Sequence, residues 1–418
     1  MATPPQPFLI SGILQHYAWG GYEYIPNLLG RQNPEQQPTA ELWLGAHPRG
    51  AATIIDSTQN LAEAIATDPE GMLGEEVANR FNNRLPFLFK VLDVREMLSI
   101  QVHPTKEAAE AGFAREEAAG IDRTAPFRNY RDDNHKPELG VAITDFYLLH
   151  GFKSKRAILR LLRVIPEWDS LLPILEAQGV SGLYEHVMSV DQPTVDRLAQ
   201  GAVDSLGPKS DDGKEGLAYW THQAVEKYSK NGHHDRGIFS IWWMNIVHLH
   251  PGEAIFQDAG VPHAYLEGVC LEVMANSDNV LRGGLTPKHI DVKELLAHTV
   301  TSPVKPKLLL PNISPDNWER YPTPSPDFAL YRAALSIGED LEIDTTEGGP
   351  LILFLLSGKL VSPSLTLTAR RRAAFIPAGQ IINFLAYERG TVVYRAGTGI
   401  REAYPGAATG GGHHISDR

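Results

Sequence analysis

The spacing of apolar positions changes twice along the chain and predicts β-rich regions on either side of a helical one. Residues 85–103 form two predicted strands with a turn near Arg95, because apolar and polar side chains alternate in the second half of the segment. Successive side chains of a strand point to opposite faces. The second strand would therefore carry Ser99, Gln101 and His103 in a row on its polar face.

Helical spacing replaces this alternation further along the chain. Pro104 opens a predicted helix over 105–119, since proline is well tolerated in the first turn of a helix. Residues 139–149 are apolar and β-branched enough for a buried strand. From 153 to 231 the apolar residues recur at helical spacing, which predicts a helical insertion with a polar loop at 207–216.

The strand pattern then returns and continues almost to the C-terminus. We expect strands over 238–256, one further helix at 291–300 with Asp291 as its N-cap, and an all-β region over 301–404. The Gly-rich segment 405–418 is expected to be a disordered tail. The fold class predicted from these patterns is mainly β with a helical insertion.

Composition and charge narrow the range of functions. With 418 residues the chain is long enough for two or three domains, and its formal net charge of −12 argues against nucleic acid or an anionic membrane as a partner. Cys270 is the one cysteine, which excludes an internal disulfide and a cysteine-rich metal site. The sequence shows neither a signal peptide nor an apolar run of membrane-spanning length. We therefore expect a cytoplasmic protein, and we expect it to be a monomer.

Two short motifs point to a metal held by a small barrel. The spacing of glycines before His263, within 250–263, resembles the second metal motif of cupins. The segment from Gln101 to His103 resembles the first cupin motif, with Gln in place of its first His. Inward positions of different strands converge inside a small barrel, so these residues could share one metal. A weaker copy nearer the C-terminus has Ile382 in the His263 slot, and Ile cannot bind metal.

The cupin resemblance implies two cupin-like, jelly-roll β-barrel domains plus a small α-helical domain. We expect a metal-binding catalytic domain formed by 1–152 and 232–300. The helical insertion domain would span 153–231. The C-terminal cupin-like domain, 301–404, would hold no metal.

Two longer blocks identify a family. The segments YRDDNHKPE at 130–138 and HAYLEGVCLEVMANSDNVLRGGLTPK at 263–288 resemble signature segments of type I phosphomannose isomerases. The resemblance runs from near the N-terminus to about residue 300, and it implies one zinc ion per chain. The ligands it implies are Gln101, His103, Glu138 and His263. It also implies that Arg282 is the active-site arginine, followed here by Gly283 where the family usually has Ala.

The reaction implied by the resemblance is interconversion of mannose 6-phosphate and fructose 6-phosphate through a cis-enediol. Negative charge would develop on two sugar oxygens, where the metal and Arg282 would stabilise it. A proton must move between two carbons, and His135, Lys136, Asp278 or a metal-bound water could carry it; the sequence does not choose among them. Candidate contacts to the sugar or its phosphate are Lys90, Ser99, Trp19, Glu41, Tyr265 and Lys288.

Other interpretations stay open at this stage. Glu107 is a rival metal ligand, although it is expected on the solvent face of its helix. Arg282 could serve only as an ion-pair partner of Glu272 or Asp278. The alternative functions are an iron-dependent cupin oxygenase, which the Gln ligand disfavours, and a non-catalytic sugar-phosphate-binding cupin, which the intact ligand set disfavours.

Overall fold

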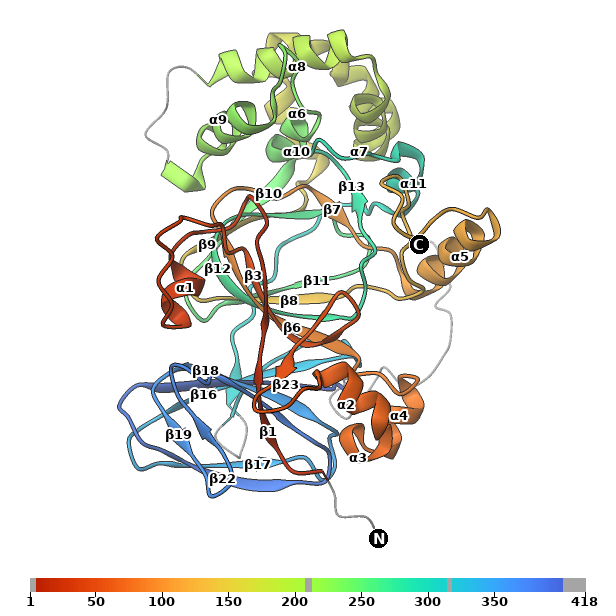
Figure 1. Ribbon diagram of the computed structural model, residues 1–418. Coiled ribbons are helices and arrows are strands. Elements are labelled where there is room, and N and C mark those ends of the chain that lie inside the picture. The colour runs from red at the N-terminus through yellow and green to blue at the C-terminus, as the bar shows by residue number, and fades with distance from the viewer. Residues whose placement is uncertain (1–4, 207–212, 314–317, 401–418) are drawn as a thin grey trace. The chain divides into compact units, whose positions relative to one another are not determined.

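A computed structural model of the protein describes residues 5–206, 213–313 and 318–400 (Figure 1). The expected disordered tail, 405–418, lies outside these residues, as does part of the expected loop at 207–216. No helix within the described ranges combines the length and the apolar character needed to cross a membrane.

The described residues form two compact units. The larger unit comprises Gly12–Ala52 and Leu88–Leu310. The smaller unit comprises the described parts of Met1–Ser11, Thr53–Phe87 and Pro311–Arg418. The expected domain boundaries stay a prediction, and the observed units differ from them in grouping 53–87 with the C-terminal residues.

The larger unit combines a large sheet with a group of helices. Its strands are β2 (Ile13–Gln15), β3 (Glu41–His47), β4 (Gly50–Ala51), β6 (Phe87–Val94), β7 (Gln101–Val102), β8 (Glu138–Ala142), β9 (Phe146–Phe152), β10 (Met244–Leu249), β11 (Ala254–Gln257), β12 (His263–Ala275) and β13 (Leu281–Arg282). Its helices are α1 (Tyr24–Leu28), α5 (Lys106–Ala118), α6 (Lys155–Leu162), η1 (Pro166–Leu171), α7 (Leu172–Ser189), α8 (Gln192–Ser205), η2 (Gly213–Glu215), α9 (Leu217–Tyr228), α10 (Gly237–Trp243) and α11 (Val292–His298).

Strand β12 organises the sheet of the larger unit. It pairs with β6, β7, β8 and β9 and so joins segments that are far apart in sequence. Helices α6 to α10 gather at one end of this sheet (Figure 1). They enclose a core with three fully buried tryptophans, Trp168, Trp220 and Trp243. The predicted helical region over 153–231 is therefore confirmed as a set of helices.

Local signals placed some elements correctly and others not. The helices predicted at 105–119 and 291–300 are α5 and α11, and the Asp291 side chain accepts the Glu294 backbone N–H as an N-cap. The first part of the strand predicted over 238–256 was wrong, because 237–243 forms helix α10. Every residue of α10 is buried, and a run that is apolar at all but one position does not distinguish a buried strand from a buried helix.

The smaller unit is mainly β, as expected for 301–404. Its strands are β1 (Phe8–Ser11), β5 (Thr53–Ile54), β14 (Asn312–Ile313), β15 (Glu319–Tyr321), β16 (Ala329–Leu335), β17 (Asp340–Asp344), β18 (Leu351–Ser357), β19 (Leu360–Val361), β20 (Thr366–Leu367), β21 (Ala373–Ile376), β22 (Ile381–Ala386) and β23 (Thr391–Gly397). Its helices are α2 (Leu61–Thr67), α3 (Pro69–Leu73) and α4 (Glu75–Arg80). Two sheets, ordered β14-β15-β16-β23-β18-β21-β1-β5 and β17-β22-β19-β20, enclose a core that includes Ile382.

Candidate metal centre

Two histidines and one glutamate from separate parts of the sheet meet in the larger unit. His103 follows β7, Glu138 begins β8 and His263 begins β12. Oε1 of Glu138 lies 3.4 Å from His103 Nε2, and its Oε2 lies 3.4 Å from His263 Nε2. All three residues are buried. Three of the four predicted ligands are thus within reach of one ion.

Hydrogen bonds orient both imidazole rings toward the carboxylate. Nδ1 of His103 donates to the Asn279 carbonyl at 3.1 Å, and Nδ1 of His263 donates to the Val261 carbonyl at 3.0 Å. A carbonyl oxygen only accepts, so each neutral ring carries its proton on Nδ1 and a lone pair on Nε2. Burial lowers the pKa of His103 to about 4, which keeps this ring neutral at pH 7.

The resulting donor set fits a zinc ion. Nε2 of His103 is buried and has no hydrogen-bond partner. Two imidazole lone pairs and a carboxylate that face one another repel unless a cation lies between them, and this is a ligand set that zinc binds. Burial opposes the charged form of Glu138, but the Lys136 ammonium 2.9 Å away holds the pKa of this carboxyl well below its usual value.

The fourth predicted ligand, Gln101, lies on the strand beside this cluster. It stands opposite His263 in the β7–β12 pair and opposite Arg282 in the β7–β13 pair. Side chains directly opposed across an antiparallel pair have Cβ atoms about 4.5–5.5 Å apart. Gln101 is therefore a neighbour of both residues, while its coordination of the metal stays a prediction.

Asn279, which the sequence did not single out, ties the ligand segments together. Its side-chain oxygen accepts the Arg131 backbone N–H at 2.7 Å, and its amide nitrogen donates to the carbonyl groups of Asp132 and Asn134 at 2.8 and 2.9 Å. Its own carbonyl accepts from His103. Asn279 is fully buried, so one residue holds the 130–138 segment with its side chain and one ligand ring with its backbone carbonyl.

A buried charge network lies on β3, β6 and β12. Lys90 Nζ lies 2.9 Å from Glu272 Oε1 and 3.9 Å from Glu41 Oε2. The Tyr265 hydroxyl donates to Glu272, and the Trp43 indole donates to Glu41. Burial alone would lower the pKa of Lys90, but the two carboxylates raise it. Because two carboxylates already match its charge, Lys90 is poorly suited to binding a phosphate.

Four cationic side chains lie close enough to influence one another. Burial lowers the pKa of Lys288, and the charges of Arg282, Arg131 and Arg49 lower it further. Burial also lowers the pKa of Arg282, with Arg131 as the next cause. An anion relieves such repulsion between cations. Arg49 and Arg131 were not predicted, although Arg131 stands inside the block at 130–138.

The remaining predicted residues occupy several environments. Asp278 accepts from Arg49 at 2.8 Å and lies 3.7 Å from His47 Nε2. The half-buried ring of Trp19 stacks on Tyr17, with ring centroids 5.8 Å apart. Among the other predicted residues, Ser99 and His135 are also half-buried, and Glu107 is exposed on α5 as expected.

Gly283 makes room for a neighbouring tyrosine. A Cβ at this position would lie 2.7 Å from the Tyr184 hydroxyl and 3.1 Å from a methyl carbon of Ile100. Tyr184 is 1% exposed and cannot move aside easily. The Tyr184 hydroxyl therefore occupies the space that the methyl group of an alanine at position 283 would take.

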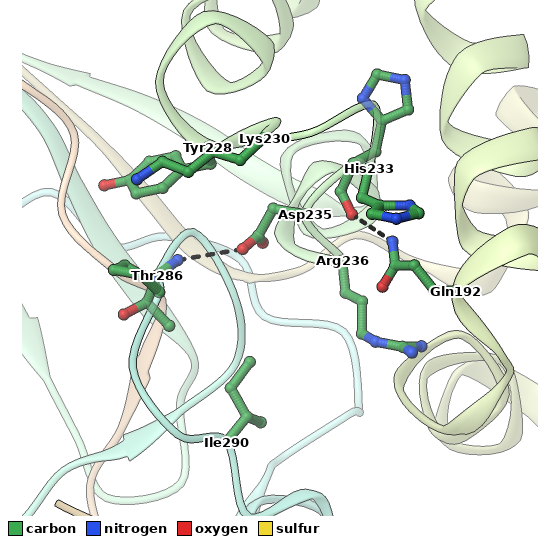
Figure 2. Close-up of a pocket in the computed structure, with 10 residues that line it drawn as sticks. Gln192, Tyr228, Lys230, His233, Asp235, Arg236, Thr286 and Ile290 are labelled. Atoms are coloured by element: carbon green, nitrogen blue, oxygen red, sulfur yellow. Dashed lines mark hydrogen bonds between the residues drawn. The ribbon is translucent and has the colours of Figure 1, made fainter.

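A separate cavity of about 320 Å³ lies between α8, the end of α9 and the segment around Thr286 (Figure 2). The Thr286 backbone N–H donates to the Asp235 carboxylate, and Gln192 donates to the His234 carbonyl (Figure 2). None of its lining residues belongs to the cluster of His103, Glu138 and His263.

Comparison with known proteins identifies the family. Residues 8–155 match the phosphomannose isomerase type I catalytic domain. The chain is 41% identical to mannose-6-phosphate isomerase of Salmonella typhimurium over 83% of this chain and 88% of that protein. It is 34% identical to the Homo sapiens protein of the same name over 94% of this chain and 98% of that one. A crystal structure of mannose 6-phosphate isomerase bound with zinc and yttrium matches with a TM-score of 0.81 and 38% identity, covering 94% of this chain and 100% of the other. The chain belongs to the type I phosphomannose isomerase family.

Proposed function

We propose that this chain is a zinc-dependent isomerase that interconverts mannose 6-phosphate and fructose 6-phosphate. The observation that carries the proposal is the buried cluster of His103, Glu138 and His263, whose lone pairs converge in a chain of this family. Gln101 would complete the ligand set from the neighbouring strand. Zinc, when bound, supplies a Lewis acid that polarises a sugar oxygen.

The remaining chemistry falls to the chain's own side chains. Arg282 stabilises the negative charge that develops on the sugar oxygens of the cis-enediol. One of His135, Lys136 and Asp278 carries the proton between the two carbons. Lys136 has its ammonium against Glu138, and Asp278 is paired with Arg49, so both are held in fixed places.

The phosphate binds at Lys288 and Arg131. Burial lowers the pKa of Lys288, and the charges of Arg282, Arg131 and Arg49 lower it further, which is the electrostatic condition for an anion site. Ser99 and Trp19 contact the sugar. Lys90, Glu41 and Tyr265 act as one buried network behind the site, and Lys90 serves there as a matched charge rather than as a phosphate ligand.

We also propose the finer features of fold and setting. The sheets form two cupin-like, jelly-roll barrels with a helical insertion at 153–231, and the barrel over 301–404 holds no metal. The protein is a cytoplasmic monomer that acts on a small sugar phosphate, without nucleic acid or membrane partners. The net charge of −12 and the single buried cysteine, Cys270, support this setting.

A coupled assay on mannose 6-phosphate tests the function. We expect chelation to abolish turnover and zinc to restore it. His263→Ala should fold but lose activity, whereas His233→Ala, which removes an exposed histidine paired with Asp196, should keep it. Turnover that resists chelation, or a folded His263→Ala variant with full activity, would refute the proposal. Oxygen consumption with bound iron would favour an oxygenase, and sugar-phosphate binding without interconversion would favour a sensor.

A further inference from the structure

A second group of metal-ligating side chains lies at the end of the β9–β10 pair in the larger unit. Asp145, His248 and His250 each offer one ligand atom, and these atoms lie within 4.8 Å of one another. The group shares no residue with the cluster of His103, Glu138 and His263. It takes no part in the proposed isomerase chemistry.

Strand geometry places these three side chains together. His248 and His250 are two residues apart along an extended segment, so they point to the same side. His248 pairs with Tyr147 and Leu249 with Phe146, which brings Asp145 opposite His250 in the same antiparallel register. Oδ1 of Asp145 lies 2.9 Å from His248 Nε2 and 3.2 Å from His250 Nδ1.

A second carboxylate fixes the ring of His248. Glu215 Oε1, in η2, lies 3.2 Å from His248 Nδ1, and the ring stacks on Tyr147 with centroids 4.3 Å apart. Two arrangements explain an imidazole that has a carboxylate beside each of its nitrogens. Either the ring is an imidazolium that donates to both carboxylates, or it is neutral, donates from Nδ1 to one carboxylate, and binds a metal at Nε2 that the other carboxylate also binds. A carboxylate that holds the far nitrogen of a histidine ligand is typical of metal sites.

The charges around this group favour a cation. Asp145 and Glu215 contribute two negative charges, and the nearby Lys214 is engaged by Glu267. The side chains of Asp145 and His250 are 61% and 67% exposed, so an ion can enter without any movement of the fold. Two imidazoles and one carboxylate with open positions suit Zn²⁺, Ni²⁺ or Cu²⁺ rather than Mg²⁺ or Ca²⁺.

We propose that Asp145, His248 and His250 form a second, exchangeable site for a divalent transition-metal ion, with Glu215 orienting His248. Water molecules complete the coordination. Because two of its three ligands, Asp145 and His250, are exposed, this site binds zinc more weakly than the buried cluster. It is independent of the isomerase proposal, since it uses none of the same residues.

The test is a titration of the zinc-loaded enzyme after dialysis has removed loosely held metal. Calorimetry with Zn²⁺ and absorption spectroscopy with Co²⁺ should both show one further ion per chain. His250→Asn and Asp145→Asn should each weaken this event at least about tenfold, as should Glu215→Gln. His233→Asn is the matched control, because His233 is exposed and paired with one aspartate, and it should leave the event unchanged. Turnover should be unaffected in all of these variants.

Two results would overturn the proposal. One is a wild-type enzyme that shows no second binding event. The other is an event that survives in both His250→Asn and Asp145→Asn, such as one that disappears only when His413 and His414, two adjacent histidines of the segment 405–418, are replaced. His250→Asn and Asp145→Asn change exposed side chains, so circular dichroism should show an intact fold in both.

Discussion

Replacing Lys90 by Met should destabilise the protein strongly, because it leaves two buried carboxylates without their cation. Lys90 is 7% exposed, and its Nζ lies 2.9 Å from Glu272 and 3.9 Å from Glu41. At an effective dielectric constant of about 20, the closer contact corresponds to roughly 6 kcal/mol of Coulomb energy before desolvation is subtracted. Breaking a buried pair on one side typically costs about 3–5 kcal/mol, and we expect Lys90→Met to fall in this range.

Urea unfolding of the zinc-loaded protein at pH 7 measures this loss. The double variant Lys90→Met, Glu272→Gln removes both charges, so it should recover at least about 2 kcal/mol relative to Lys90→Met alone. Lys293→Met makes the same substitution at an exposed lysine on α11 and should change stability by less than about 0.5 kcal/mol.

The pH dependence supplies a second check on the Lys90 argument. Burial raises the pKa of Glu272 in the folded protein even with Lys90 present, and removing Lys90 raises it further. The folded variant therefore binds a proton that the unfolded chain binds only at lower pH. Its deficit relative to wild type should shrink as the pH is lowered from neutrality. A loss below about 1 kcal/mol, or a double variant no more stable than Lys90→Met, would refute the reasoning.

Four further predictions concern single positions. Gly283→Ala should cost about 1–3 kcal/mol in urea unfolding because its methyl group meets the Tyr184 hydroxyl, and Tyr184→Phe should offset much of this; an unchanged stability would contradict it. Burial lowers the pKa of His150 to about 3, so below the ordinary histidine pKa the unfolded chain binds a proton that the folded protein does not, and the stability falls with the pH. His150→Leu should therefore flatten this fall between pH 6.5 and 4 by about 1 kcal/mol per pH unit, measured with chelator in both proteins. Equal slopes would contradict this prediction. Arg131→Gln should raise KM for mannose 6-phosphate more than it lowers kcat, whereas an unchanged KM would remove Arg131 from the phosphate site. Asn279→Ala should weaken zinc binding about 10–100-fold in a competition titration with a chelator, because it removes the side chain that fixes the position of the backbone carbonyl bound by His103; wild-type affinity would exclude that role.

Sequence patterns predicted the elements whose signals are local. The helix predicted after Pro104 is present, but Pro104 lies before its N-cap and not in its first turn; the N-cap is Thr105, whose hydroxyl accepts the Ala108 backbone N–H. Asp291 does the same for α11. Such caps depend on residues three apart in sequence, so they can be recognised without knowledge of the tertiary structure.

Elements that depend on tertiary surroundings could not be predicted in the same way. The run from Gly237 to Trp243 is apolar except for Ser240, and only its packing in the core of the larger unit decides that it is a helix. The predicted strand through Ser99 is shorter than expected, since regular pairing is limited to Gln101 and Val102.

The candidate site shows the same division between local and tertiary information. Family motifs named His103, Glu138 and His263, and the structure brings them together. They gave no reason to choose Asn279 or Arg131, because these act through backbone contacts and through charges from distant segments. Lys90 was expected to bind the phosphate because it interrupts an apolar strand. The sequence does not show that the carboxylates of Glu41 and Glu272 lie beside its ammonium group.

The order of the ligands along the chain has a consequence for synthesis. Glu138 lies on β8 and His263 on β12, and these two strands pair directly with each other. Helices α6 to α10 nevertheless lie between them in the sequence. A growing polypeptide that has exposed His103 and Glu138 still lacks the third donor until the ribosome has released β12. Metal binding must therefore come late in biosynthesis. A nascent chain that stalls within the helical segment has His103 and Glu138 but lacks His263, and strand β12 is not yet there to complete the sheet around them.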